Sequence, residues 1–204
     1  MVSRVILARH GDIAADMSRY WGQTDVPLSA AGLEQAGRLR DRLAAEKIEA
    51  VYSSDLKRAL DTATVVALPH RLAVMPCPEL REIDFGQCEG LSFDEIKLRY
   101  PEAETIWTAS DLGISFPGGE SVAVLAERVD RFLATLRSIS VGTALVVAHG
   151  GPLRVLICRL TGLNLSEWRH VHIERSSLSI IEVNSDGGTI QLLNDVSHLQ
   201  KEAA

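Results

Sequence analysis

Hydrophobic and polar positions follow two different periods along this chain of 204 residues. Short runs of apolar, β-favouring residues occupy positions 4–8, 49–54 and 143–148, and they predict strands. Between these runs, apolar residues return at every third or fourth position, which is typical of amphipathic helices. Strands that alternate with helices favour an α/β fold, here a three-layer α/β/α sandwich with a mostly parallel central sheet.

Helices are predicted where an apolar stripe follows a residue that can cap a helix N-terminus. The stripe of Leu33, Ala36, Leu39 and Leu43 is expected to face the core. The predicted helices run from about Ala30 to Ala45 with Ser29 as N-cap, from Ser54 or Asp55 to Leu68, from the Ser92 and Glu95 capping box to a point before Pro101, from near Ser121 with Leu125, Val129, Phe132 and Leu136 on one stripe, and from Pro152 to Gly162.

The remaining segments predict a hairpin and an irregular excursion. Residues 177–183 and 189–194 are β-favouring runs on either side of the turn sequence NSDGG. Residues 101–119 contain Trp107, Phe116 and a Pro-Gly-Gly turn, and long ordered loops of this kind often cover functional sites. Because no linker or repeat separates these elements, residues 1–204 are expected to form a single domain.

Composition narrows the classes of partner. The net charge of −6 argues against nucleic acid, so any bound anion must be held by a few well-placed cations. The three cysteines have neither metal-binding nor redox spacing, which indicates reduced thiols in the cytoplasm. The first apolar run is too short for a signal peptide, and no run approaches the ~20 apolar residues of a membrane span, so no membrane partner is expected.

Two histidine–glycine pairs end two of the predicted strands. His10 follows VILAR, with Arg9 beside it, and His149 follows LVVA. Ligands of open α/β sheets bind beyond the carboxyl ends of parallel strands, so both imidazoles are expected in one site. A helix begins near Gly151 with N–H groups that can bind an anion, and the Arg9 guanidinium suits phosphate oxygens. These residues predict a phosphate pocket that contains two imidazoles.

Ordered motifs extend this prediction over the whole chain. They are ARHG at 8–11, DVPLSAAG at 25–32, YSSDLKRALDTA at 52–63, LREIDFGQCEG at 80–90, PGGES at 117–121 and VVAHGG at 146–151. Together they resemble the histidine phosphatase superfamily, also called the phosphoglycerate mutase-like family. Within it the chain looks most like α-ribazole phosphatases and broad-specificity bacterial phosphatases. The resemblance implies a phosphoglycerate mutase-like sandwich and a metal-independent, acid-type phosphatase without a cofactor.

The resemblance also assigns catalytic and phosphate-binding roles to matching positions. His10 would attack phosphorus and become a phosphohistidine, which a neutral imidazole can do near pH 7. Glu82 would protonate the leaving oxygen and then activate water, and repulsion from the bound phosphate is expected to keep it protonated for the first step. The phosphoryl oxygens would be held by Arg9, Arg58, His149 and the Gly150 amide.

Two positions depart from the family pattern. Asp16 stands where relatives carry an Asn that donates to the phosphate. Since a carboxylate would repel that group, we expect Asp16 to point elsewhere and leave it out of the site. Cys88 stands where many relatives carry a Trp, which is expected to change only local packing.

The predicted partner is a small-molecule phosphate ester, with α-ribazole 5′-phosphate as first choice. The alternatives are a broad-specificity small-molecule phosphatase, a cofactor-dependent phosphoglycerate mutase and a non-catalytic binder of phosphorylated ligands. Mutases of the family have a longer chain, with an insert after the segment that carries the acid. Residues 101–119, with Tyr20 and Trp21, are expected to form the leaving-group pocket. The residues carry no prediction of the oligomeric state.

Overall fold

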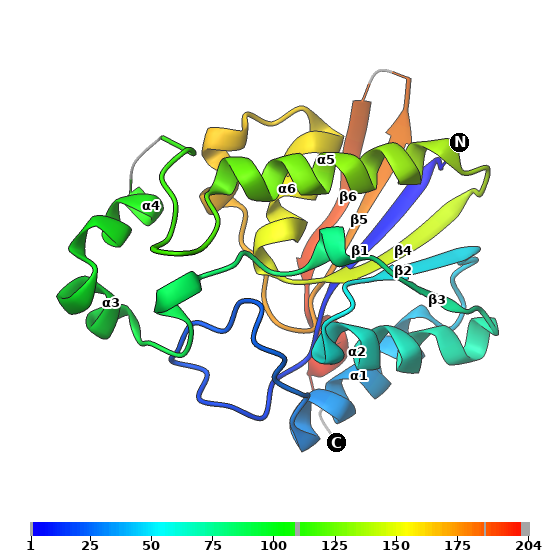
Figure 1. Ribbon diagram of the computed structural model, residues 1–204. Coiled ribbons are helices and arrows are strands. Elements are labelled where there is room, and N and C mark those ends of the chain that lie inside the picture. Colours follow the sequence, from blue (N-terminus) through cyan, green and yellow to red (C-terminus); the bar gives the residue numbers. More distant parts are fainter. Residues whose placement is uncertain (1, 109–110, 186, 201–204) are drawn as a thin grey trace.

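The computed structural model describes residues 2–108, 111–185 and 187–200 (Figure 1). Its centre is a six-stranded sheet with the order β3-β2-β4-β1-β5-β6. The strands are β1 (Arg4–Arg9), β2 (Ala50–Ser53), β3 (Val74–Pro76), β4 (Thr143–Ala148), β5 (Leu178–Asn184) and β6 (Gly187–Asp195). β1 to β4 are parallel, whereas β5 and β6 are antiparallel to their neighbours. The mostly parallel sheet predicted from the sequence is confirmed.

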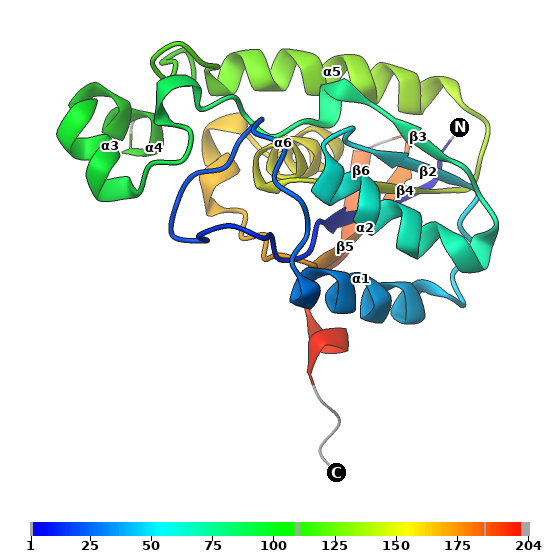
Figure 2. The same cartoon turned by 60° about the horizontal axis from the view of Figure 1, so that its bottom comes forward.

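Helices cover both faces of the sheet, and in Figure 2 α5 lies above it and α1 below it. The helices are α1 (Ala30–Leu43), α2 (Lys57–Ala67), α3 (Phe93–Arg99), α4 (Thr105–Thr108), α5 (Val122–Ser138) and α6 (Gly150–Thr161). Single 3₁₀ segments occupy Leu68–His70, Pro78–Leu80, Gly86–Cys88, Pro101–Glu104, Leu165–His170 and Ser197–Leu199. α3 and α4 lie at one end, outside the sandwich (Figures 1 and 2). In the described ranges, no helix has the length and apolarity needed to cross a bilayer.

Strand β1 is buried on both faces because alternate side chains point to opposite layers. Val5 and Leu7 pack with apolar residues of α5 and α6, whereas Ile6 and Ala8 pack with those of α1 and α2. None of the four is more than 2% exposed. Burial of apolar surface stabilises the fold by about 25 cal/mol per Å², so the strand is a firm base for the residues that follow it.

The predicted helix caps are confirmed for three helices. The hydroxyls of Ser29 and Ser121 accept a backbone N–H from the first turn of α1 and α5, at 3.0 and 3.2 Å. Ser92 and Glu95 form the reciprocal capping box at the start of α3. These starts were predictable because a cap depends on residues that are close in sequence.

The start of α2 was predicted wrongly. Neither Ser54 nor Asp55 is its N-cap; that position is Leu56, whose side chain makes no capping hydrogen bond. Instead Asp25, from a distant loop, accepts the Lys57 N–H at 2.7 Å. A tertiary contact therefore satisfies the helix end, and no local sequence pattern reports it.

Packing and regularity also differ from the prediction in places. Leu33 is 51% exposed, because the buried stripe of α1 begins at Gly32 and Leu33 lies on the solvent side. Residues 101–119 are more regular than expected, since they begin with a 3₁₀ segment and α4. Residues 109–110 and the side chain of Trp107 lie outside the described part of the chain. The short edge strand β3 has no counterpart in the predicted elements.

Candidate active site

The ends of β1 and β4 bring the two predicted histidines together. The strands pair in parallel with Arg9 opposite Ala148, so His10 and His149 follow side by side. Their ring centroids are 5.0 Å apart, and the rings are tilted by 58°. His10 is 4% exposed and His149 is completely buried. Motifs from opposite ends of the chain thus lie in one place, as the strand-end argument predicted.

The hydrogen bonding of His10 leaves one ring nitrogen available as a nucleophile. Its Nδ1 lies 2.7 Å from the Gly11 carbonyl oxygen, and because a carbonyl can only accept, Nδ1 carries the ring hydrogen. Nε2 then keeps its lone pair. Burial, with the charges of Arg9 and Arg58, holds the pKa of His10 well below its usual range, so the ring is neutral at pH 7.

His149 supports His10 from within the core. Its Nε2 lies 2.8 Å from the Ser54 hydroxyl, and its buried Nδ1 has no hydrogen-bond partner among the described residues. Burial, with the charge of Arg58, holds the pKa of His149 well below its usual range. The ring is therefore neutral and packed against His10, and its predicted contact with phosphoryl oxygens stays a prediction.

Helix α6 begins directly after His149, two residues earlier than predicted. Gly150 is its first residue, and Pro152, predicted to be first, is third. The first N–H groups of a helix have no partner within it, so a proline there removes no helical hydrogen bond. The two amides before Pro152 are free for other groups. The Gly151 N–H donates to Glu82, and Gly150 lines the cavity beside it.

Backbone N–H groups hold one carboxyl oxygen of Glu82. Its Oε1 accepts from Gly151 and from Ile83, both at 2.9 Å. This approach requires a glycine, because a Cβ at position 151 would lie 2.4 Å from Oε1. Oε2 lies toward Gly150, where an added Cβ would be 3.6 Å both from that oxygen and from Cζ of Arg9. Since Oε1 already accepts two hydrogens, a proton on this carboxyl belongs on Oε2, near the phosphate-binding residues.

Two arginines of the site are anchored to backbone carbonyls. Arg58, in the first turn of α2, is 1% exposed and donates to three carbonyl oxygens of the loop at 21–24. Arg9 donates to the Ile173 carbonyl at 2.8 Å. Burial lowers the pKa of Arg58, and it lowers the pKa of Arg9 to about 10. Both guanidiniums are therefore charged at neutral pH and can bind phosphoryl oxygens.

These side chains, with the exception of the fully buried His149, line one cavity of about 340 Å³. The predicted residues that line it are Arg9, His10, Arg58, Glu82 and Gly150. Its apolar and aromatic walls are formed by Ile13, Met17, Tyr20, Trp21, Ile83, Phe85, Phe93, Ile106, Phe116 and Trp168. Tyr20, Trp21 and Phe116 were expected near the leaving group. The cavity thus has a charged end, called here the phosphoryl end, and a mainly apolar end, called the leaving-group end.

Three further arginines line the cavity, although no motif singled them out: Arg19, Arg154 and Arg175. Arg154 follows Gly150 by four positions and so lies on the same face of α6, which is a signal that the sequence contains. Its Nε donates to a carbonyl at 2.8 Å, while its terminal nitrogens have no hydrogen-bond acceptor within the described ranges. Arg175 makes a long ion pair with Asp12, at 3.9 Å, and Arg19 pairs with two nearer carboxylates.

The two departures from the family pattern leave the phosphoryl end intact. Asp16 is 55% exposed at its side chain, accepts hydrogen bonds from Ser18 and Arg19, and is not among the described residues that line the cavity. Cys88 is buried in the core beside the α3 region, which agrees with a packing role. No carboxylate at position 16 therefore opposes a bound phosphate.

A comparison with known protein families decides the family. The sequence profile of the histidine phosphatase superfamily (branch 1) matches residues 5–196. The chain belongs to this superfamily. Within the described residues, no group of three or more His, Cys, Asp or Glu side chains is arranged to hold a metal ion.

Relatives of this histidine phosphatase carry different substrate names. Phosphoserine phosphatase 1 of Hydrogenobacter thermophilus is 34% identical over 96% of this chain and 94% of that protein. The adenosylcobalamin/α-ribazole phosphatase of Escherichia coli is 33% identical over 94% of this chain and 95% of that protein. The crystal structure of the α-ribazole phosphatase from Shigella flexneri matches with a TM-score of 0.83 and 32% identity, over 94% of this chain and 96% of that one. The predicted family and phosphatase class are confirmed, and the family acts on small phosphate esters.

Proposed function

We propose that this histidine phosphatase hydrolyses phosphate monoesters through a phosphohistidine on His10. Nε2 attacks phosphorus, the bond from phosphorus to the ester oxygen breaks, and the alcohol leaves with the proton of Glu82. Water then attacks the phosphohistidine and gives a proton to Glu82, which releases inorganic phosphate and restores the imidazole. The observation that carries the proposal is the Nδ1 hydrogen bond of His10, which leaves the Nε2 lone pair on a residue of the cavity lining.

The proposed reaction needs no metal ion and no cofactor. Charge builds up on the equatorial oxygens during phosphoryl transfer, and the guanidiniums of Arg9 and Arg58 stabilise it in a site with little solvent. The lowered pKa of His10 keeps the nucleophile unprotonated below pH 6.5, which supports an acid-type phosphatase. Activity is expected to survive EDTA and to be inhibited by vanadate, which mimics the pentacoordinate phosphoryl group.

The first candidate substrate is α-ribazole 5′-phosphate. The names of two relatives, from Escherichia coli and Shigella flexneri, support it. The aromatic side chains of the leaving-group end support it as well, because rings such as Trp21 and Phe93 offer apolar surface for a heteroaromatic base. The alternative is a broad-specificity small-molecule phosphatase, because the same apolar walls can also contact other apolar alcohols.

A second candidate is an ester whose alcohol carries its own negative charge, such as phosphoserine. The observation that favours it is the pair Arg154 and Arg175, which adds cations to a cavity that already has Arg9 and Arg58 for the phosphoryl group. Two guanidiniums can balance the two negative charges of the phosphoryl group, and a protonated Glu82 adds no further negative charge. The positive charges of Arg154 and Arg175 are therefore left for a second anionic group of the substrate. The name of the Hydrogenobacter thermophilus relative supports this candidate.

A panel of phosphate esters ranked by kcat/KM tests the proposal and separates the candidates. It includes α-ribazole 5′-phosphate, phosphoserine, a neutral alkyl phosphate and p-nitrophenyl phosphate. Release of inorganic phosphate from at least one ester is expected, together with an acid-labile phosphoenzyme on His10. Isomerisation of 3-phosphoglycerate with its bisphosphate cofactor, without phosphate release, would instead indicate a mutase. Binding of esters without any turnover would indicate a non-catalytic binder.

The proposed place of action is the cytoplasm. Cys77, Cys88 and Cys158 are free thiols, which is usual for proteins of a reducing compartment. Burial raises the pKa of Cys77 to about 11, so this half-buried thiol is protonated at neutral pH and reacts slowly with oxidants.

A further inference from the structure

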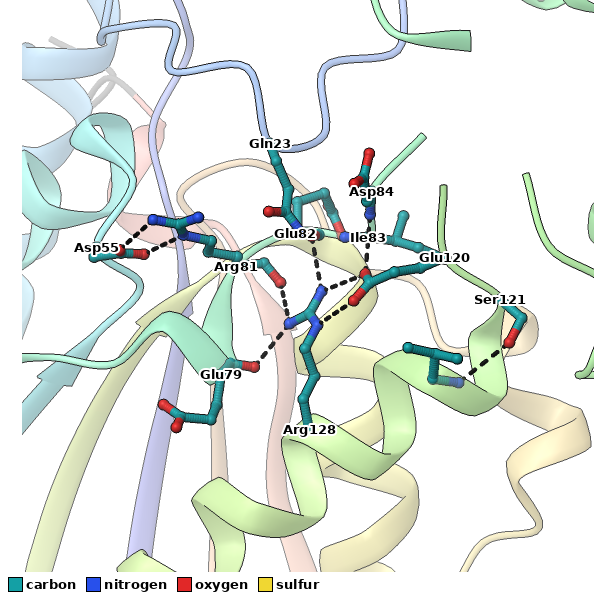
Figure 3. A network of polar contacts seen from close by, with 11 residues as sticks. Gln23, Asp55, Glu79, Arg81, Glu82, Ile83, Asp84, Glu120, Ser121 and Arg128 are labelled. Carbon is teal, nitrogen blue, oxygen red and sulfur yellow. Dashed lines mark hydrogen bonds and ion pairs between the residues drawn. The ribbon is translucent and has the colours of Figure 1, made fainter. Parts of the chain in front are cut away.

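A single buried arginine holds the segment that carries Glu82. Arg128 lies on α5 and is 7% exposed. Its guanidinium donates to the carbonyl oxygens of Glu79, Arg81 and Glu82 at 2.7, 2.6 and 2.8 Å (Figure 3). Residues 82–85 belong to no helix or strand, so their backbone depends on partners of this kind.

The charge of Arg128 is balanced by Glu120, which belongs to the PGGES motif. Oε1 and Oε2 of Glu120 accept from Nε and Nη2 of Arg128, both at 2.9 Å. Together with the three carbonyl contacts, these bonds use as many hydrogens as a guanidinium has. Oε2 also accepts the Asp84 N–H at 3.0 Å, and the Glu120 N–H donates to the Asp84 carbonyl at 2.9 Å. The pair therefore holds the backbone on both sides of Glu82.

Glu82 is consequently held at two points by two different helices. Arg128 of α5 binds its backbone carbonyl, and the Gly151 N–H of α6 binds its carboxyl oxygen. Figure 3 shows the guanidinium of Arg128 between the Glu82 backbone and Glu120. Arg128 itself is not among the described residues that line the cavity. It can therefore influence the reaction through the group that it holds, and through its charge, which also acts on His149.

We propose that Arg128, together with Glu120, is a positioning residue for the proton transfer by Glu82. The proposal rests on the proposed function, in which Glu82 protonates the leaving oxygen. A displacement of a reacting group by about 1 Å can reduce a rate by roughly 10²-fold, so loss of these contacts weakens protonation even where the fold survives. Phosphate binding, which uses Arg9 and Arg58, is not expected to change.

The test compares esters that need a proton on the leaving oxygen with one that does not. p-Nitrophenolate leaves readily without a proton, whereas an alkoxide does not. The variant Arg128→Lys keeps the positive charge but loses the planar fork of donors. Its kcat/KM for an alkyl phosphate is expected to fall by about 10²-fold. Its kcat/KM for p-nitrophenyl phosphate is expected to fall by less than about threefold. kcat/KM is the proper measure because it reports only the steps up to formation of the phosphoenzyme.

A double variant shows whether Arg128 acts through Glu82. Adding Arg128→Lys to Glu82→Gln is expected to change alkyl phosphate hydrolysis by less than about threefold, because the position of a lost proton donor no longer matters. A full multiplicative loss in the double variant would overturn the proposal, since Arg128 would then act elsewhere. If Glu82→Gln itself shows no dependence on the leaving group, the proposed function fails instead.

Matched variants guard against an effect of folding alone. Arg159 also forms a two-point ion pair with a carboxylate of α5, Asp130, but at the surface. Arg159→Lys is expected to leave the ratio of alkyl to aryl kcat/KM unchanged. Where circular dichroism shows that Arg128→Lys is unfolded, Glu120→Gln replaces it, because the amide removes the charge and turns one of the two acceptor oxygens into a donor. An unchanged alkyl-to-aryl ratio in the folded variant would overturn the inference.

Discussion

The two ends of the cavity are built from different parts of the fold. At the phosphoryl end, His10 and Gly150 follow β1 and β4, and Arg58 lies in the first turn of α2. At the leaving-group end, side chains such as Met17 and Phe93 come from a loop and from the peripheral helix α3, and they are 46% and 39% exposed. Figure 1 shows α3 and α4 apart from the sheet. Elements of the core thus hold the reacting group, while loops, which tolerate change, surround the alcohol.

The largest effect is expected from removal of the proposed nucleophile at the phosphoryl end. His10→Ala should lower turnover by on the order of 10⁴-fold or more for every ester, since residues that act as a unit lose nearly all catalysis together. Radiolabelled substrate followed by acid treatment measures the phosphoenzyme. The control is His170→Ala, a histidine that is 71% exposed at its side chain. An acid-labile phosphoenzyme that persists in His10→Ala would refute the assignment.

A smaller and selective effect is expected at the boundary between the two ends. Glu82→Gln should reduce kcat/KM for alkyl phosphates by roughly 10² to 10⁴-fold, because a general acid contributes about that much. Aryl phosphates with good leaving groups should lose far less. Steady-state kinetics on a series of leaving groups measures the difference. Equal losses for both classes of ester would contradict the assignment of Glu82 as the proton donor.

Variants of Arg154 and Arg175, the further arginines of the cavity that lie near Arg9, should sharpen the comparison further. Arg154→Gln or Arg175→Gln is expected to raise KM for phosphoserine by about tenfold, since a hydrogen bond to a charged group contributes ~1.5–3 kcal/mol. KM for a neutral alkyl phosphate should change by less than about threefold. Arg137→Gln, on the exposed side of α5, serves as control. Equal changes for both esters would place these arginines at the phosphoryl group instead.

The smallest effect concerns stability at the phosphoryl end. The pKa values of His10 and His149 are far below the value near 6.5 that histidine has in an unfolded chain. Below pH 6.5 the unfolded chain therefore binds more protons than the folded one, and the free energy of unfolding falls as the pH falls. Each site contributes up to ~1.4 kcal/mol per pH unit until its folded-state pKa is reached.

Urea midpoints at pH 7.5 and pH 5.5 measure this dependence. His149→Gln should show a smaller difference between the two midpoints than the unchanged protein, because one of the depressed titrations is gone. His198, whose pKa burial also lowers, remains in both proteins and cancels in the comparison. Identical differences in the two proteins would contradict a buried, neutral His149.

The phosphoryl end was largely predictable from the sequence. Apolar runs fixed the positions of β1 and β4, and parallel pairing then required that His10 and His149 be neighbours. Arg58 and Glu82 could be placed only by resemblance to the superfamily, because no periodicity indicates that a helix and a loop face the same cavity. For these two residues the structure supplies the geometry that the motifs lacked.

The features that could not be predicted from the sequence depend on contacts between segments that are distant in the chain. Asp25 satisfies the first N–H of α2, and Arg128 satisfies three carbonyls that lie far from it in the chain. Such partners leave no periodic signal, since each depends on how separate loops meet. The prediction that Leu33 faces the core was wrong for a local reason. The adjacent Gly32 fits against the Asp12 backbone, where a larger side chain would collide.

The close contact at Gly151 limits how this site can evolve. A methyl group there would sit 2.4 Å from a Glu82 oxygen, so even alanine forces the acid out of place. Substitution of Gly151 is accordingly expected to displace the Glu82 carboxyl, whereas exposed residues such as Met17 and Phe93 can be exchanged without touching it. Changes at the exposed leaving-group end can therefore alter which alcohol fits, while the Gly151 backbone keeps the proposed proton donor in place.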